Sequence, residues 1–146
     1  FLLTRADTLL SRPFMDEVER RGFSVAEWRI LAALYDADRL TVGEIAELVL
    51  LPQPTVSRWI DRLEQQSLIA RAGVAADRRR TIVRLTPAGR SAAKRLITAA
   101  TDQLEKVEAR LPARDVAELE RILRSVIAEF ERDSGATLSR RSRRRP

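Results

Sequence analysis

Cysteine and histidine are both missing from this chain of 146 residues. Without cysteine the protein has no disulfide, thiolate nucleophile, Cys-ligated zinc site or cysteine redox switch. Without histidine it lacks the commonest general base and a leading metal ligand. No glycine-rich phosphate loop is present either. We therefore expect no catalytic residue, no metal and no cofactor, and we predict that the protein is not an enzyme.

Long apolar runs are missing as well. No run approaches the roughly 20 residues that a membrane-spanning helix needs. Arg5, Asp7 and Arg12 interrupt the first apolar stretch and no small-residue cleavage site follows, so a secretory signal is not predicted. We expect a cytoplasmic protein without a membrane partner. Because Phe1 stands where a start methionine would be, we also expect the gene product to begin further upstream.

Positive charge is confined to two parts of the chain. The net charge is +6, in a composition that is 45% hydrophobic and 33% charged, a balance typical of globular proteins. Residues 53–90 hold eight arginines against three acidic residues, and residues 134–146 hold five arginines and no acid, whereas the rest is net negative. Such clustering is typical of a surface that faces phosphates. Charge alone leaves open the alternative of a solvated basic face without a partner.

Apolar residues recur every three or four positions from Leu3 to Val18 and predict a first helix. Pro13 lies inside this helix and is expected to kink or split it, and Gly22 is expected to end it. Two capping boxes, in residues 24–27 and 41–44, then mark the starts of two further helices, because each pairs a Ser or Thr with a Glu three positions later.

A fourth helix is predicted from Pro54, whose missing N–H costs nothing in a first turn, to about Gln66. With the helix before it, it forms a helix-turn-helix, whose second helix enters the major groove with its N-terminal residues toward the base edges. The residues expected to contact DNA are Gln53, Pro54, Thr55, Ser57, Arg58 and Arg62. The alternative for these side chains is ordinary capping and exposed helix surface.

A β-hairpin is predicted next, because the apolar period changes from helical to alternating. Residues 68–71 form its first strand, residues 72–78 its turn and residues 80–85 its second strand. Its tip carries Asp77, Arg78, Arg79 and Arg80. We expect the three arginines to approach a narrow minor groove, where the negative potential is enhanced, and Asp77 to pair with Arg79 and hold the tip in shape. A solvated arginine cluster is the alternative. With this hairpin the helix-turn-helix becomes a winged one.

Thr86 and Pro87 begin a long helix, which Pro112 stops, and a last helix follows with the same apolar spacing of three and four positions. The apolar stripes of these two helices are wider than a lone winged domain needs, so we expect a homodimer. Packing of the two helices only on each other is the alternative. The expected organisation is a helical dimerisation region (1–22 and 87–133), a winged helix-turn-helix DNA-binding domain (23–86) and a basic, disordered tail (134–146).

Five stretches resemble one known family in their order and spacing: Glu27-Trp28-Arg29-Ile30-Leu31, Pro54-Thr55-Val56-Ser57-Arg58, Ile60-Asp61-Arg62-Leu63-Glu64, Asp77-Arg78-Arg79 and Val83-Arg84-Leu85-Thr86-Pro87-Ala88-Gly89-Arg90. Residues 24–131 resemble the MarR family of bacterial regulators. The resemblance implies a mainly α fold with a small β-hairpin, a homodimer, a palindromic operator of double-stranded DNA and, usually, repression. It implies that Ser57 and Arg58 touch DNA and that Asp77 and Arg79 match the family's acidic-x-Arg wing motif.

The resemblance also implies release from DNA by a small phenolic or other aromatic anion. Phe14, Trp28 and Tyr35 are the expected aromatic walls of an effector pocket, and Arg90 is the expected cation for a carboxylate; the alternative is that these aromatics belong to the core. Ser67 departs from the family, because a glycine usually follows the recognition helix, and we expect Ser67 to be left-handed. The arginine tail is not a family feature either.

Two other functions stay open. An architectural or constitutive dimeric DNA-binding protein would have no effector and would bind random DNA as well as an operator. A helical interaction protein would use its last two helices, with DNA binding incidental.

Overall fold

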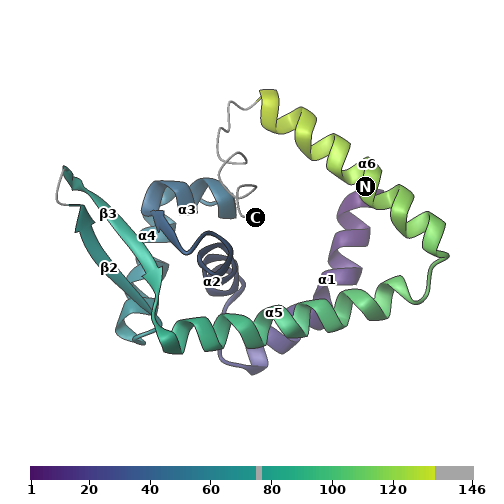
Figure 1. Cartoon of the computed structure of the whole chain (residues 1–146). Helices are drawn as coiled ribbons and strands as arrows, with labels where there is room; N and C mark the ends of the chain where they lie inside the picture. Colours follow the sequence, from purple (N-terminus) through teal and green to yellow (C-terminus); the bar gives the residue numbers. More distant parts are fainter. Residues whose placement is uncertain (75–76, 134–146) are drawn as a thin grey trace, which may run out of the picture. The chain divides into compact units, whose positions relative to one another are not determined.

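The structure is mainly helical with one small antiparallel sheet, as the sequence predicts (Figure 1). This computed structural model describes residues 1–74 and 77–133, without the side chains of residues 74, 77–80, 131 and 133. The predicted tail, residues 134–146, lies outside the described residues. The elements in chain order are α1 (Leu2–Arg20), α2 (Val25–Ala37), β1 (Arg39–Thr41), α3 (Val42–Val49), α4 (Gln53–Gln65), β2 (Ile69–Val74), β3 (Asp77–Leu85), α5 (Pro87–Glu108) and α6 (Ala113–Asp133).

The chain divides into two compact units. The first, Phe1–Ala99, contains α1 to α4, the sheet and the beginning of α5, and the second contains the rest of α5 and α6. None of the described helices combines the length and the hydropathy that a membrane crossing requires. The division by function, into a dimerisation region and a DNA-binding domain, stays a prediction.

Helix α1 runs through Pro13 without a break, so the predicted split does not occur. Its end is as expected, because Gly22 has φ +82°. The backbone N–H groups of Gly22 and Phe23 donate to the carbonyls of Glu19 and Val18, at 2.9 and 3.1 Å. This pair of hydrogen bonds is the Schellman motif, in which a left-handed residue satisfies the last carbonyls of a helix.

Both capping boxes form as predicted. The backbone N–H of Glu27 donates to Ser24 Oγ at 3.2 Å, and the backbone N–H of Ser24 donates to Glu27 Oε2 at 2.7 Å. Thr41 and Glu44 make the same pair of bonds at 3.2 and 2.8 Å. Helices α2 and α3 therefore start where their caps place them.

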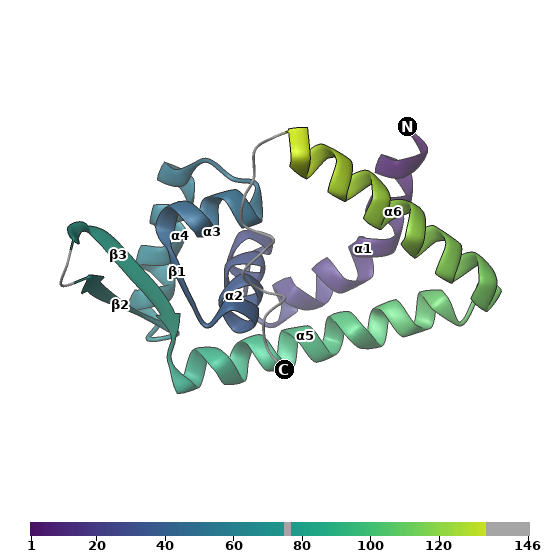
Figure 2. The same ribbon diagram turned by 45° about the horizontal axis from the view of Figure 1, so that its top comes forward.

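Strand β1 is absent from the sequence prediction, which treats residues 36–39 as a polar break. In the structure, Arg39–Thr41 pairs antiparallel with β3, and Leu40 lies opposite Val83 with both side chains buried (Figure 2). A strand of three residues shows no alternating pattern of its own. Its hydrogen bonds come from residues more than 40 positions away, so only the tertiary fold produces it.

The predicted hairpin turn is too long. Residues 72–78 were expected as turn, yet the β2–β3 ladder continues through Gly73 opposite Thr81 and ends with Val74 opposite Asp77. The register shifts between Gly73 and Val74. Glycine in a sequence often indicates a turn, but inside a strand it also tolerates a bulge. Here Gly73 belongs to the strand.

The core of the first unit lies between the helices and one face of the sheet. Leu40, Ile69 and Val83 face inward from the three strands. Against them lie buried side chains of five helices: Phe14, Val18, Ile30, Leu31, Leu34, Ile45, Val49, Val56, Ile60, Leu63, Ala93 and Leu96. The periodic apolar residues of the sequence thus form one contiguous interior, as amphipathic helices require.

The start of α5 packs directly on the chain that leaves α4. Thr86 caps α5 as predicted, since the backbone N–H of Gly89 donates to Thr86 Oγ1 at 3.0 Å. The backbone N–H of Thr86 donates to the Leu68 carbonyl at 3.0 Å. A Cβ added to Gly89 would lie 1.8 Å from that same carbonyl oxygen, so only glycine fits here.

We therefore expect Gly89→Ala to lower the free energy of unfolding by about 3 kcal/mol, because the backbone of Leu68 or α5 must shift. Gly43→Ala is the matched control: no atom lies within 4 Å of its Cβ, and in helix α3 alanine should stabilise by up to about 1 kcal/mol. Urea unfolding of both variants measures the difference. A Gly89→Ala protein as stable as wild type would contradict this close approach.

Ser67 is left-handed, as the sequence predicts, with φ +58°. It closes α4 as Gly22 closes α1: the backbone N–H groups of Ser67 and Leu68 donate to Glu64 and Leu63, at 2.8 and 3.0 Å. A residue with a Cβ pays about 1 kcal/mol for this conformation, which glycine adopts freely.

Ser67→Gly should accordingly raise the melting temperature by about 2–4 °C, the shift that about 1 kcal/mol produces in a chain of this size. Gln66→Gly is the control, because Gln66 has φ −79° and gains nothing from glycine. Differential scanning calorimetry distinguishes them: Gln66→Gly should melt lower than wild type. Equal melting of wild type and Ser67→Gly would mean that the left-handed conformation carries no cost here.

Candidate nucleic-acid interface

Helix α4 has one buried side and one exposed side. Val56, Ile60 and Leu63 are fully buried and hold the helix against the core. Pro54 and Arg58 are exposed on the opposite side, and Thr55 and Ser57 are half-buried on its flanks. Gln53, three positions before Val56, is in line with the buried residues but is exposed at the first position of the helix. The predicted contact residues near the start of α4 therefore do lie on one accessible surface, while Trp59, expected on the apolar side, is only half-buried.

A tight turn joins α3 to α4 and makes the helix-turn-helix. Leu50 takes the left-handed conformation at φ +56° and ψ +43°, and it is 87% exposed. The backbone N–H of Leu51 donates to the Ala46 carbonyl at 3.1 Å and closes α3. The Pro52 carbonyl then accepts from Thr55 and Val56 in the first turn of α4. This turn exposes the first residues of α4 next to the end of α3.

The arginines in and beside α4 differ in their partners. Among the described residues, Arg58 has no carboxylate within ion-pair distance, so its guanidinium is available to an outside anion. Arg62 and Arg71 are both paired within the protein. The sequence prediction grouped Arg62 with Arg58 as a DNA contact, and the structure places the two in different surroundings.

Arg62 lies beside a buried carboxylate of helix α2. Its Nε is 3.2 Å from Glu27 Oε1, and Glu27 has no exposed surface at all. The Arg62 guanidinium also stacks 5.5 Å above the ring centre of Trp59. Its side chain is nevertheless 54% exposed. A DNA contact of Arg62 therefore stays a prediction beside this contact within the protein.

Arg71 of strand β2 bridges two carboxylates of α4. It donates to Asp61 Oδ1, and its Nε lies 3.4 Å from Glu64 Oε2. Sequence analysis missed this link, although the three-residue spacing of Asp61 and Glu64 places both on one side of a helix. No local pattern points to Arg71 as their partner, because β2 approaches α4 only after the hairpin folds back.

The wing residues fall largely outside what the structure describes. The backbone of Asp77, Arg78, Arg79 and Arg80 forms the first part of β3 (Figure 1), but their side chains lie outside the described residues. The backbone places these four residues at the end of β3 nearest the hairpin turn. Their approach to a minor groove stays a prediction.

The residues expected to form an effector pocket come together as two pairs. Phe14 and Trp28 meet edge to face, with ring centres 5.0 Å apart, and Phe14 is buried. The Arg90 guanidinium lies 5.2 Å above the ring of Tyr35 and pairs with Asp38 at 2.8 Å. No group of His, Cys, Asp or Glu side chains among the described residues is placed to hold a metal ion.

Comparison with known proteins agrees with this geometry. Residues 21–80 match the model of the MarR family. The solved structure of a MarR family transcriptional regulator from Silicibacter pomeroyi superposes with a TM-score of 0.79, at 29% identity, over 89% of this chain and 93% of that one. In sequence and in fold the chain is similar to the MarR family.

Two more proteins are similar to this chain over different lengths. The transcriptional repressor MdtR of Bacillus subtilis is 37% identical over 75 residues, which cover 51% of this chain and about half, 48%, of that repressor. BpsR of Bordetella bronchiseptica, whose DNA binding is regulated by 6-hydroxynicotinic acid, has a TM-score of 0.76 at 26% identity, over 86% of this chain and 95% of that one. This chain is a DNA-binding transcriptional regulator with the winged helix-turn-helix of that family.

Proposed function

We propose that this MarR-family regulator represses transcription as a homodimer bound to a palindromic operator, with α4 as the recognition helix. The observation that carries the proposal is the surface at the start of α4. There Arg58, which has no ion-pair partner among the described residues, and the half-buried Ser57 project away from the fully buried side, and the exposed Gln53 begins the helix. Arg and Gln side chains bond purines in bidentate fashion, and Ser bonds bases or phosphates.

In this proposal the wing supplies the second contact with DNA. Arg78, Arg79 and Arg80 reach the minor groove, where guanidinium groups gain from the enhanced negative potential, and Asp77 pairs with Arg79 and holds the tip in shape. The eight arginines of residues 53–90 support this orientation, because the rest of the chain before the tail is net negative. The five arginines of residues 134–146 add affinity for any duplex and no specificity.

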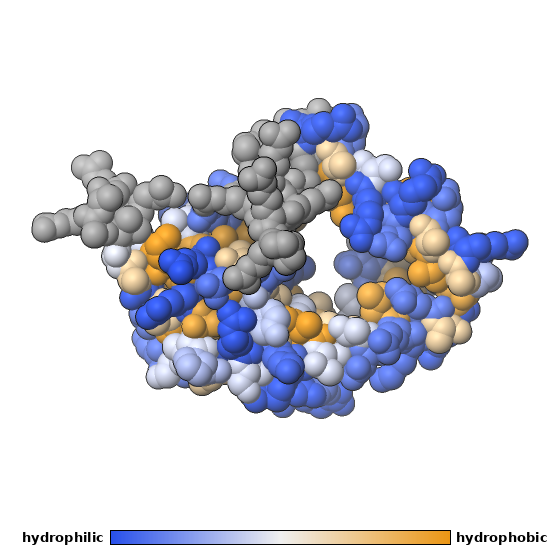
Figure 3. Space-filling model, viewed as in Figure 1, coloured by the Kyte–Doolittle hydropathy of each residue, from blue (hydrophilic) through white to orange (hydrophobic). Residues whose placement is uncertain are grey.

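The exposed apolar side of α6 supports the homodimer. Its large apolar side chains are between 39% and 67% exposed: Leu119, Ile122, Leu123, Val126, Ile127 and Phe130. Apolar atoms interrupt the polar surface along this helix (Figure 3). A continuous apolar stripe of this kind is typical of an interface, and a two-fold pair would place two recognition helices about 34 Å apart, one turn of DNA.

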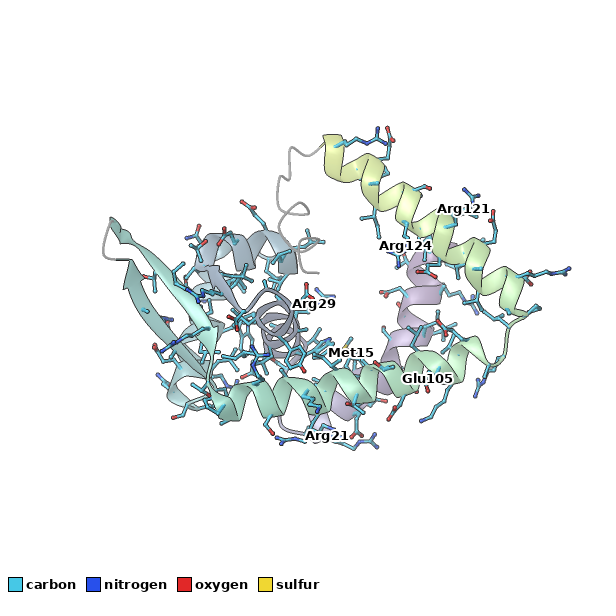
Figure 4. The ribbon with its side chains drawn as sticks, viewed as in Figure 1. Met15, Arg21, Arg29, Glu105, Arg121 and Arg124 are labelled. Carbon is cyan, nitrogen blue, oxygen red and sulfur yellow. The ribbon has the colours of Figure 1, made fainter. Side chains whose placement is uncertain are left out.

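The polar side of α6 is built of ion pairs along the helix. Arg121 donates to Glu118 at 2.7 and 2.8 Å, and Arg124 donates to Glu120 (Figure 4). The hydrogen bond from Arg121 holds the pKa of Glu118 below its usual value. These residues keep one side of α6 hydrated, so the dimer interface proposed here is restricted to the opposite, apolar side.

We further propose that a small aromatic anion weakens operator binding. The pairs Phe14–Trp28 and Tyr35–Arg90 supply aromatic surface and one guanidinium, and regulation of BpsR by 6-hydroxynicotinic acid supports this class of effector. Asp38 already pairs with Arg90, so the carboxylate of an effector would have to displace it. A constitutive or architectural dimer without an effector is the second candidate.

Selection from a random DNA pool should yield a palindrome with half-site centres about 10 base pairs apart.

On that operator, Arg58→Ala should cost about 1–3 kcal/mol of binding free energy and relax the preference at one position of each half-site. Arg79→Ala should weaken binding to all duplexes and flatten the salt dependence by about one unit. Fluorescence anisotropy at several salt concentrations measures both. Unchanged affinity in both variants would contradict the assignment of α4 and the wing as the elements that contact DNA.

Saturating 6-hydroxynicotinic acid, or a related hydroxylated aromatic acid, should weaken operator binding about tenfold, within the range of ordinary allosteric coupling. Arg90→Gln should lose this response, because the carboxylate then lacks its cation. Titration of the acid into the preformed operator complex measures the effect, with benzyl alcohol as the uncharged control. No response to any acid in the panel would favour the constitutive DNA-binding protein.

A further inference from the structure

Glu27 is the one charged side chain that is buried among the residues that the structure describes. Its Oε2 accepts hydrogen bonds from the backbone N–H and the hydroxyl of Ser24, at 2.7 and 2.9 Å. Its Oε1 has no hydrogen bond and faces Arg62 Nε at 3.2 Å. A buried carboxylate needs a cation or further donors, because leaving it unpaired costs much more than leaving it in water. Arg62 is that cation.

The capping box alone does not explain this arrangement. One carboxylate oxygen makes the box: Glu27 Oε2 accepts from the backbone N–H and the hydroxyl of Ser24, as Glu44 Oε2 accepts from those of Thr41 at the start of α3. In the Glu27 box, one oxygen serves the helix start and the other points toward α4. The second oxygen thus links the start of α2 to the recognition helix.

The contact between α2 and α4 has a diffuse part and a localised part. Burial of apolar side chains from α4 is non-directional and permits small rotations of the helix about its axis. The attraction between Arg62 and Glu27 joins one point on each helix and weakens as their separation grows beyond 3.2 Å. The stacking of the Arg62 guanidinium on Trp59, 5.5 Å from the ring centre, further limits the orientations of the Arg62 side chain. The link between Glu27 and Arg62 is therefore suited to set the rotation of α4.

Arg58 lies four residues before Arg62, so the two side chains project from the same side of α4, one turn apart. Rotation of the helix would move Arg58 and Ser57 together across the surface that meets DNA. Arg62 has an internal partner, whereas Arg58 has none among the described residues. The first arginine is thus free to read DNA while the second holds the helix.

We propose that Arg62 is a positioning residue, and that its contact with the buried Glu27 orients α4 so that Arg58 and Ser57 meet the operator in register. This assignment rests on the proposed role of α4 as the recognition helix. It departs from the sequence expectation that Arg62 itself contacts DNA. It also gives Glu27, which has no surface to offer DNA, a part in operator recognition.

Glu27→Gln tests the proposal from the buried side. Glutamine keeps an acceptor for Ser24 and removes the charge that holds Arg62. We expect affinity for the selected operator to fall about tenfold, with no change in the salt dependence and no change in affinity for random duplex. Anisotropy of the full chain on both duplexes measures this. Arg79→Ala is the control whose salt dependence does change. An operator affinity equal to wild type would overturn the proposal.

A double-mutant cycle tests Arg62 itself. Arg62→Gln alone and Glu27→Gln with Arg62→Gln should each bind the operator about tenfold more weakly than wild type, whereas independent residues would give about a hundredfold loss in the double variant. If Arg62 contacts DNA directly, Arg62→Gln will cost as much in the Glu27→Gln chain as in wild type, and the proposal is wrong. A flatter salt dependence in Arg62→Gln would likewise show a phosphate contact.

The same variants distinguish a folding defect from a specific loss of operator recognition. If a single variant no longer unfolds cooperatively, the double variant carries the test, because it buries no charge. It should melt as one transition and show the tenfold loss on the operator alone. Wild-type affinity in that folded double variant would overturn the proposal. Failure of the wild-type chain to prefer any duplex would instead disprove the proposed function, which the parallel measurement on wild type reveals.

Discussion

Burial of Val56, Ile60 and Leu63 is the interaction on which the proposed DNA-binding surface depends. Each large apolar side chain contributes about 1.5–3 kcal/mol when fully buried, and these three have no exposed surface. With that side of α4 in the core, the helix can present only its polar side to a partner. The exposed position of Arg58 follows from this burial, because residues on opposite sides of a helix cannot both face inward. Gln53 is in line with the buried residues and is exposed at the first position of α4.

The ends of α4 are held by the backbone. Before it, Leu50 takes a left-handed conformation, and after it Ser67 does the same, so the chain reverses within a few residues at both ends. Beyond Ser67, the Leu68 carbonyl accepts from Thr86 at the start of α5 and leaves room only for Gly89. Helix α4, the base of the hairpin and the start of α5 therefore meet at one point. A shift at any of these elements would be felt by the other two, since close-packed interiors yield little.

The site was partly predictable. Residue types and spacing around α4 identified its exposed polar side correctly, because helical periodicity is written in neighbouring residues. The same periodicity treated Arg58 and Arg62 alike, as two arginines one turn apart. Their difference arises from Glu27 on another helix, just as the role of Arg71 arises from the return of β2 toward α4. Charge and position along a helix do not reveal which cation a distant carboxylate will hold.

By itself the sequence determined several features whose cause lies within a few residues. These features include the capping boxes of α2 and α3, the left-handed ends at Gly22 and Ser67, and the start of α5 at Thr86. Tertiary structure alone decided the three-residue strand β1, the length of the β2–β3 ladder and the partners of the arginines. The reason is physical: a cap or turn is completed by its own neighbours, whereas a ladder or an ion pair needs two segments that only the folded chain brings together.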